Sequence, residues 1–139
     1  MHSIRLRGPW DLFLPGSEAP RRVEMPATWQ TLLALTAESP LPSPARLVRR
    51  FGLPTGIAQR DQLHLVIDSA TVPCQVELNG QPLGNIGPSG HSSSFDVTTL
   101  LAGRNELAIL LEIPPLKSEP VTEGSPLGDV RLEITPQPE

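Results

Sequence analysis

The sequence predicts an all-β protein in which two antiparallel sheets pack as a sandwich. Apolar and polar residues alternate in several segments with a period of two, which places one face of each strand in a core. The 139 residues include 17 prolines and 11 glycines, which interrupt long helices. The strands follow one another too closely for the crossover helices that parallel sheets need, so the pairing is expected to be antiparallel.

The N-terminal third contains short extended segments and one helical segment. Three segments are expected to be strands: residues 3–7, 10–14 and 21–25. Thr28 is the expected N-cap of a helix over residues 28–35, the one segment with a convincing helical period. Three prolines then predict an irregular connection over residues 36–44.

The remaining strands alternate more clearly. They are expected over residues 46–51, 63–68, 74–79, 105–113 and 130–134, the last after an irregular loop over residues 114–128. Asn79-Gly80 is the strongest hairpin signal, because both residues tolerate positive φ, and it joins residues 81–83 to the preceding strand.

A short turn is expected between two of these strands. Phe95 ends a strand, and Asp96 or Thr98 is expected to cap a single turn over residues 98–101. Gly103 is expected to end that turn in the left-handed conformation.

Composition limits the classes of partner that the protein is expected to have. The formal charge is −4, from 11 basic and 15 acidic residues, and basic residues cluster only in short pairs, so nucleic acid is not an expected partner. Cys74 is the single cysteine, so we expect no internal disulfide, no structural zinc and no cofactor. The sequence has neither a signal-peptide pattern nor an apolar run that could span a membrane, so we expect a cytoplasmic protein without a membrane partner.

Several landmarks occur together in a fixed order. They are Leu6-x-Gly8-x-Trp10-x-Leu12-Phe13, Val23-x-Met25-Pro26-x-x-Trp29-Gln30, Leu47-x-Arg49-x-Phe51-x-Leu53-Pro54, Leu63-x-Leu65, Ala70, Val76-x-Leu78-Asn79-Gly80, Leu83-Gly84, Phe95-Asp96-Val97-Thr98, Leu101-x-Gly103-x-Asn105-x-Leu107 and Gly128-Asp129-Val130-Arg131-Leu132-Glu133. This pattern resembles the N-terminal sugar-binding-type domain of glycoside hydrolase family 2. The resemblance implies a galactose-binding-like jelly roll that occupies residues 1–139 as one domain.

The same resemblance limits the expected activity. In that family the acid/base and the nucleophile are two glutamates of a later barrel, and a barrel alone takes about 250 residues. We therefore expect no enzyme activity from these 139 residues. The expected role is a carbohydrate-binding or assembly module; alternatives are a protein-interaction scaffold without a sugar ligand and, less favoured, a small hydrolase.

One candidate sugar site is the polar loop over residues 87–94 together with the end of the Asn79-Gly80 hairpin. His91, Ser92 and Ser93 supply hydroxyl and imidazole hydrogen bonds there, and Asn79 adds an amide. A Ser/His pair also permits a hydrolase interpretation, but no Gly-x-Ser-x-Gly elbow is present. The other possibility is a solvated loop without a ligand.

Arginines on the strand over residues 46–51 form a second candidate site. Arg46 and Arg50 could bind the carboxylate of a uronic acid or of an acidic protein, although an internal salt bridge is the simpler explanation and the favoured one. Val66 and Leu110 lie among polar residues on the outer faces, which is typical of a surface covered by another protein or by a second copy of this chain.

The remaining chemistry-bearing residues are expected to be structural. Trp10 and Trp29 are predicted core residues, which leaves few aromatic rings for stacking on a sugar. His64 is expected on the outer face of its strand. Three carboxylates, those of Asp68, Glu77 and Asp96, could hold a structural calcium ion or could simply be solvated.

Overall fold

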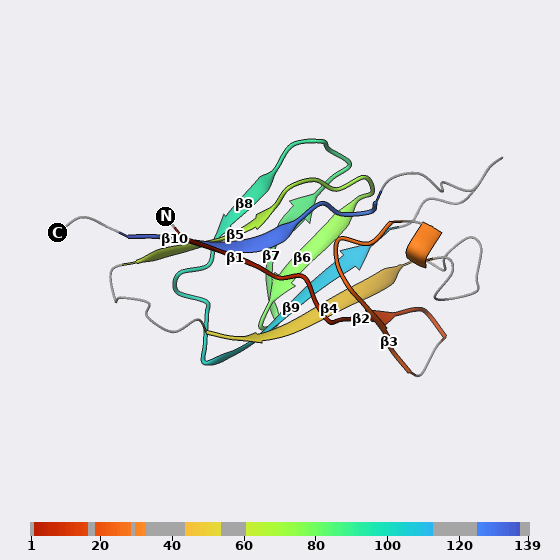
Figure 1. Ribbon diagram of the computed structural model, residues 1–139, viewed down its shortest axis with the longest axis horizontal. Coiled ribbons are helices and arrows are strands. Elements are labelled where there is room, and N and C mark those ends of the chain that lie inside the picture. The colour runs from red at the N-terminus through yellow and green to blue at the C-terminus, as the bar shows by residue number, and fades with distance from the viewer. Residues whose placement is uncertain are drawn as a thin grey trace.

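A computed structural model of the chain describes residues 2–16, 19–28, 30–32, 44–53, 61–112 and 125–136. These residues form two antiparallel β-sheets that face each other across one core (Figure 1). The predicted all-β sandwich is therefore confirmed. Trp29, the end of the predicted helix and most of the two predicted irregular loops lie outside the described residues.

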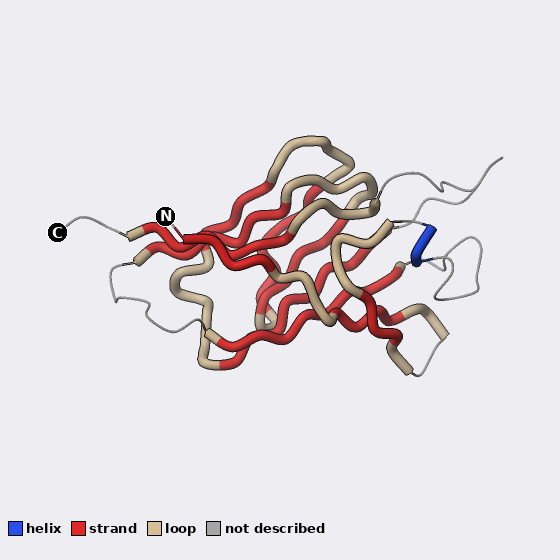
Figure 2. Tube along the Cα trace, viewed as in Figure 1, coloured by secondary structure: helices blue, strands red, loops and turns tan. Residues whose placement is uncertain are grey.

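The smaller sheet has four strands and the larger has six. In spatial order the smaller sheet contains β1 (His2–Arg5), β10 (Val130–Thr135), β5 (Gln62–Ile67) and β8 (Ser93–Asp96). The larger contains β3 (Arg21–Val23), β2 (Trp10–Phe13), β4 (Ala45–Gly52), β9 (Arg104–Leu111), β6 (Cys74–Leu78) and β7 (Gln81–Ile86). Strands dominate the described chain, as the red segments of Figure 2 show.

The core lies between the two sheets because each strand buries alternate residues. In β10, for example, Val130, Leu132 and Ile134 are buried and the residues between them are not. Trp10 has 0% exposed surface, and its Nε1 donates a hydrogen bond to the Leu6 carbonyl oxygen at 2.7 Å. The core role predicted for Trp10 is therefore confirmed.

The predicted N-cap and the predicted turn cap are both confirmed. The Thr28 hydroxyl accepts a hydrogen bond from the Thr31 amide at 3.1 Å, and residues 30–32 are helical. The Asp96 carboxylate accepts hydrogen bonds from the Thr98 amide at 3.0 Å and from its hydroxyl at 2.6 Å. These hydrogen bonds stabilise the ionised carboxylate and so lower the pKa of Asp96.

The predicted hairpin is also present, whereas the role expected of Gly103 is wrong. Asn79 and Gly80 have φ of 53° and 82°, as a two-residue turn between right-twisted strands requires. Gly103 is not among the residues with positive φ. Its carbonyl oxygen instead accepts a hydrogen bond from the Leu53 amide at 3.0 Å, so this glycine meets the end of β4 directly.

Within the described ranges, no helix has the length and the apolar character needed to span a bilayer.

Candidate functional site

A shallow hollow of about 660 Å³ lies at the end of the six-stranded sheet where β4 ends and β9 begins, at the lower left of Figure 1. Its lining residues come from those two strands, from the turn before β9 and from the β6–β7 turn: Arg50, Phe51, Gly52, Asn79, Gly103, Arg104, Asn105 and Glu106. The hollow therefore combines cationic, amide and carboxylate groups within the size range of small-molecule sites.

The pairing of β4 with β9 explains why the surface is hollowed there. Arg50 lies opposite Glu106, and Gly52 lies opposite Arg104. Because side chains alternate along a strand, all four residues belong to the same outer face of the sheet. Gly52 contributes no side chain, and a Cβ atom placed on it would meet only the Gly103 carbonyl oxygen within 4 Å, at 3.6 Å. The missing side chain leaves a gap beside the two arginines.

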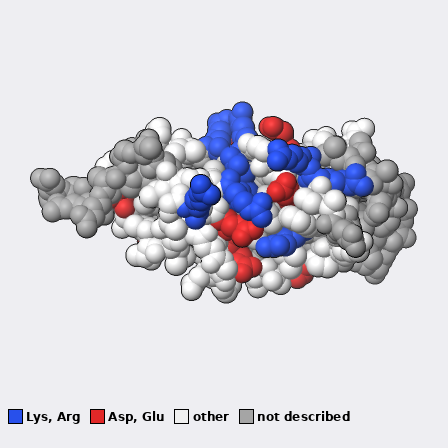
Figure 3. All heavy atoms as spheres, turned by 90° about the horizontal axis from the view of Figure 1, so that it is seen from below, with Lys and Arg blue, Asp and Glu red and all other residues white. Residues whose placement is uncertain are grey.

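The arginines at the hollow are only weakly paired. Arg50 reaches Glu106 Oε1 at 3.4 Å and Asp11 Oδ2 at 3.6 Å, while its own side chain stays 67% exposed. Exposed ion pairs of this length contribute little, about 0–1 kcal/mol, because water and salt screen them. Arginines and carboxylates intermingle on the side of the molecule formed by β2, β3 and β4 (Figure 3). A ligand anion would therefore have little to displace around Arg50.

Asn105 stabilises the floor of the hollow and is itself only 3% exposed. Its Oδ1 accepts hydrogen bonds from the Ala102 amide at 2.8 Å and from Asn79 Nδ2 at 3.0 Å. Its Nδ2 donates to the Ala102 carbonyl oxygen at 2.9 Å and to that of Phe51 at 3.4 Å. One amide therefore joins the end of β4, the turn before β9 and the β6–β7 hairpin.

Replacing Asn105 with alanine should lower the free energy of unfolding by about 2–4 kcal/mol, because buried partners lose hydrogen bonds that water cannot replace. Urea denaturation followed by circular dichroism measures this loss. Asn85→Ala is the matched control, since Asn85 is exposed on β7, and it should change stability by less than about 0.5 kcal/mol. Equal stability of the two variants would contradict the role given to Asn105.

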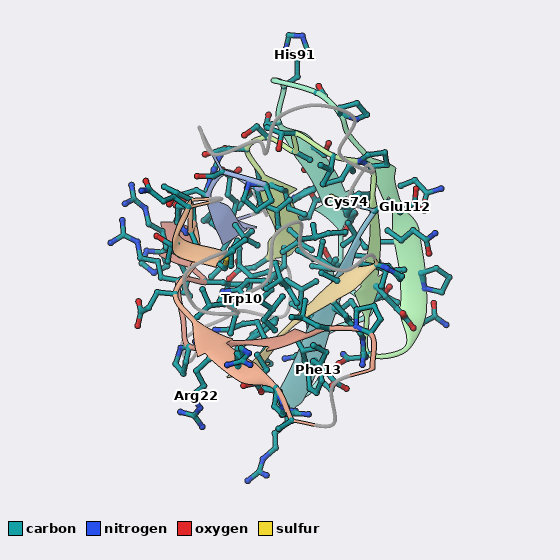
Figure 4. All side chains as sticks on the ribbon, turned by 90° about the vertical axis from the view of Figure 1, so that its right-hand side faces the viewer. Trp10, Phe13, Arg22, Cys74, His91 and Glu112 are labelled. Atoms are coloured by element: carbon teal, nitrogen blue, oxygen red, sulfur yellow. The ribbon has the colours of Figure 1, made fainter. Side chains whose placement is uncertain are left out.

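The structure separates the residues of the first predicted site. Asn79 borders the hollow, whereas His91 and Ser92 lie beyond the far end of β7 and Ser93 already belongs to β8. A strand of this length spans about 20 Å, so these groups do not form one site. His91 projects away from the body of the molecule (Figure 4), and its amide donates to the Ser89 hydroxyl at 3.0 Å.

Asn79 itself is occupied by structural hydrogen bonds. Its Nδ2 donates to the Leu100 carbonyl oxygen at 3.1 Å as well as to Asn105, and its Oδ1 accepts from the Glu106 amide at 2.8 Å. Its side chain is therefore better suited to shaping the wall of the hollow than to binding a ligand.

The structure also separates the two predicted arginines. Arg50 takes part in the internal ion pairs that were the simpler explanation for it. Arg46 lies on the same strand and face but does not line the hollow; its guanidinium carbon lies 5.9 Å from the centre of the Phe13 ring. This distance is typical of a cation–π contact.

Val66 lies on the outer face of β5, as expected, but it does not form an exposed apolar surface. Val66 is only 4% exposed, and it lies between Arg131 and Ser94 of the neighbouring strands. Arg131 pairs with Asp68 and Glu133, so charged side chains already cover that face. Leu110 remains half-buried on the other sheet.

The predicted calcium ligands do not meet. Asp68 pairs with Arg131 and Asp96 binds Thr98, both on the four-stranded sheet, whereas Glu77 belongs to the six-stranded one. Within the part of the chain that is described, no three His, Cys, Asp or Glu side chains come together as metal ligands. His64 lies opposite Glu133 and Asp96 on the outer face, as expected.

The single cysteine is a poor nucleophile. Cys74 is buried beside Glu112 (Figure 4), and burial together with that carboxylate raises the pKa of its thiol to about 12. Its Sγ donates to the Val72 carbonyl oxygen at 3.2 Å. The thiolate that covalent catalysis requires is therefore strongly disfavoured.

Sequence reasoning did not identify Gly52, Arg104 and Asn105 as residues of a site. A signal for Asn105 was present, because it stands in phase with the buried residues of β9 and is therefore a polar residue at an inward position. Gly52 and Arg104 carried no comparable signal, since their roles depend on the pairing of two strands that are distant in sequence.

Comparison with known proteins identifies the fold. No family model matches the sequence, and no curated protein matches it either. Among solved structures, an FMN-binding β-glucuronidase from Faecalibacterium prausnitzii L2-6 shares 23% identity at a TM-score of 0.73, over 97% of this chain and 22% of that one. A β-glucuronidase from Bifidobacterium dentium, complexed with coumarin-3-O-glucuronide, shares 19% identity at a TM-score of 0.73. This match covers 97% of this chain and 30% of that one.

A third match extends the fold beyond glucuronidases. A β-D-mannosidase from Dictyoglomus thermophilum gives 18% identity and a TM-score of 0.71, over 96% of this chain and 22% of that one. The chain thus spans less than a third of each of these enzymes. The predicted resemblance is confirmed for the fold: the chain has the galactose-binding-like sandwich found in glycoside hydrolase family 2 enzymes.

Proposed function

We propose that this chain acts as a non-catalytic module of the family 2 type and that it binds carbohydrate in the hollow between β4 and β9. The supporting observation is the hollow itself, in which Arg50, Arg104 and Glu106 surround a gap above Gly52. Planar charged groups of this kind bind sugar hydroxyls and carboxylates. The family's hydrolysis needs two opposed carboxylates, and the glutamates of its barrel are not part of the fold described here.

The expected affinity is weak. Phe51 is the one aromatic residue that lines the hollow, and it is half-buried, so the hollow offers little of the stacking surface that gives sugar sites much of their affinity. A few polar contacts that exchange with water support a dissociation constant of about 1 mM.

Ligand-observed saturation-transfer NMR tests the proposal. Neutral and acidic methyl glycosides are added to the wild-type chain and to Gly52→Val, which fills the gap. We expect signals from at least one sugar with the wild type and none with Gly52→Val. Because Gly52 has ordinary φ and no close neighbours, the variant should fold normally. Signals that survive Gly52→Val but vanish in His91→Ala would place the sugar at the loop over residues 87–94 instead.

A second candidate function is that of an assembly module. It is favoured by the absence of an exposed aromatic ring among the residues that the structure describes and by Leu53, a large apolar residue that is 41% exposed and directly follows Gly52. Its partner would be another protein or a second copy of this chain. Light scattering at increasing concentration and affinity capture with the tagged chain test this function, which fails if the protein stays monomeric and no partner is recovered.

A further inference from the structure

We propose that the hollow selects sugars that carry a carboxylate, and that Arg50 and Arg104 bind this group across the gap above Gly52. This inference rests on the proposed function, since it names the class of sugar that the same site would take. A uronic acid residue has this chemistry, because it carries a carboxylate on a ring with hydroxyl groups.

The positions of the two arginines are fixed by the strands that carry them. Arg50 precedes Gly52 by two residues on β4, and Arg104 lies directly opposite Gly52 on β9. Neighbours of these two kinds stand about 7 Å and about 5 Å apart at their Cα atoms. Both residues therefore flank the position of Gly52, on the same face of two adjacent strands.

Charge favours an anionic ligand at this position. The lining contains Arg50 and Arg104 against the single carboxylate of Glu106. Arg50 already lies within 3.4 Å of Glu106 and within 3.6 Å of Asp11, a carboxylate outside the lining. The charge of Arg104 is therefore the less compensated one and is the charge available to an anionic ligand. Guanidinium groups bind carboxylates with paired, charge-assisted hydrogen bonds, which a neutral hydroxymethyl group cannot replace.

Hydrogen bonds also fix the backbone at the end of β4 and in the turn before β9. The turn beneath it is tied by Asn105 to the end of β4 and to Asn79, and Gly103 bonds directly to Leu53. The backbone that carries both arginines is therefore held before a ligand arrives, which reduces the entropy lost on binding. Glu106 remains beside the gap to accept hydrogen bonds from ring hydroxyls.

The test compares methyl β-D-glucuronide with methyl β-D-glucoside, which differ only in the carboxylate, by NMR titration of the labelled chain. We expect at least tenfold tighter binding of the glucuronide. Arg104→Gln should weaken glucuronide binding about tenfold and so reduce the difference in affinity between the two glycosides, since a charge-assisted hydrogen bond corresponds to about that factor. Arg46→Gln is the control, because Arg46 lies on the same face outside the hollow, and it should have no effect.

Each of the other possible results of these titrations refutes a different part of the proposal. Equal binding of both glycosides, abolished by Gly52→Val, would refute the selectivity and leave the proposed sugar site intact. Binding of neither would refute the sugar site as well. Glucuronide binding that survives Gly52→Val would refute the location. Acetate that binds as tightly as the glucuronide would show an unspecific anion site and would also overturn the inference.

Discussion

Replacing Trp10 with alanine is expected to lower the free energy of unfolding by about 3–5 kcal/mol, the usual cost of removing a large aromatic ring from a core. Trp10 has 0% exposed surface, and its indole hydrogen bond to Leu6 joins the start of β2 to the segment that arrives from β1. Since Leu6 also donates to the Val130 carbonyl oxygen at 2.8 Å, this side chain links the two sheets. Domains of this kind are stable by only about 5–15 kcal/mol, so the loss is large.

Urea denaturation followed by far-ultraviolet circular dichroism measures this effect without relying on tryptophan fluorescence. Trp10→Phe is the matched control, because it keeps an aromatic ring and removes the 2.7 Å hydrogen bond. It should cost about 1–3 kcal/mol, the range for leaving a buried acceptor unpaired together with a small loss of packing. A loss below about 1 kcal/mol for Trp10→Ala would show that the ring is not a core residue.

The second large effect is expected from Gly87→Ala, at the connection between β7 and β8. Gly87 has φ of 73°, and a Cβ atom on it would lie 2.9 Å from the Ala70 Cβ and closer still to the Val72 carbonyl oxygen. The chain is held tightly there, since Ala70 and Ser89 exchange backbone hydrogen bonds at 3.1 Å and 2.7 Å. We expect a loss of at least about 3 kcal/mol, from the left-handed conformation and from the backbone clash together.

Gly80→Ala separates the cost of the left-handed conformation from the cost of the clash. Gly80 has a similar φ of 82°, but no atom lies within 4 Å of the position its Cβ would take. It should therefore show only the conformational cost, about 1–2 kcal/mol. Thermal unfolding of both variants provides the comparison. Equal loss from the two substitutions would mean that the segment around Ala70 moves aside at no cost.

Local signals were sufficient for most elements of the fold. The alternation in β5, β6, β9 and β10 predicted strands that the structure confirms. The caps at Thr28 and Asp96 and the turn at Asn79-Gly80 were predictable for the same reason, because each depends on residues that are neighbours in sequence. Gly103 was the exception: a glycine after a turn is compatible with the left-handed conformation but does not require it.

The candidate site was predictable only in part. Asn79 and Arg50 were identified, but their partners were not, and His91 was wrongly grouped with Asn79 although a whole strand separates them. Period-two alternation tells which residues share a face of one strand. It carries no information about which strand lies beside it or which end of the sandwich a loop occupies.

The sequence by itself determined the class of the fold, its strands, its tight turns and the burial of Trp10, because short-range alternation and backbone preference act within a few residues. Only the tertiary structure decided that β4 pairs with β9, which places Gly52 opposite Arg104 and opens the hollow. It also decided that Asn105 joins three segments, and that Val66 is covered by Arg131. These outcomes depend on contacts between distant residues, whose energies are set by packing of the whole sandwich rather than by any local pattern.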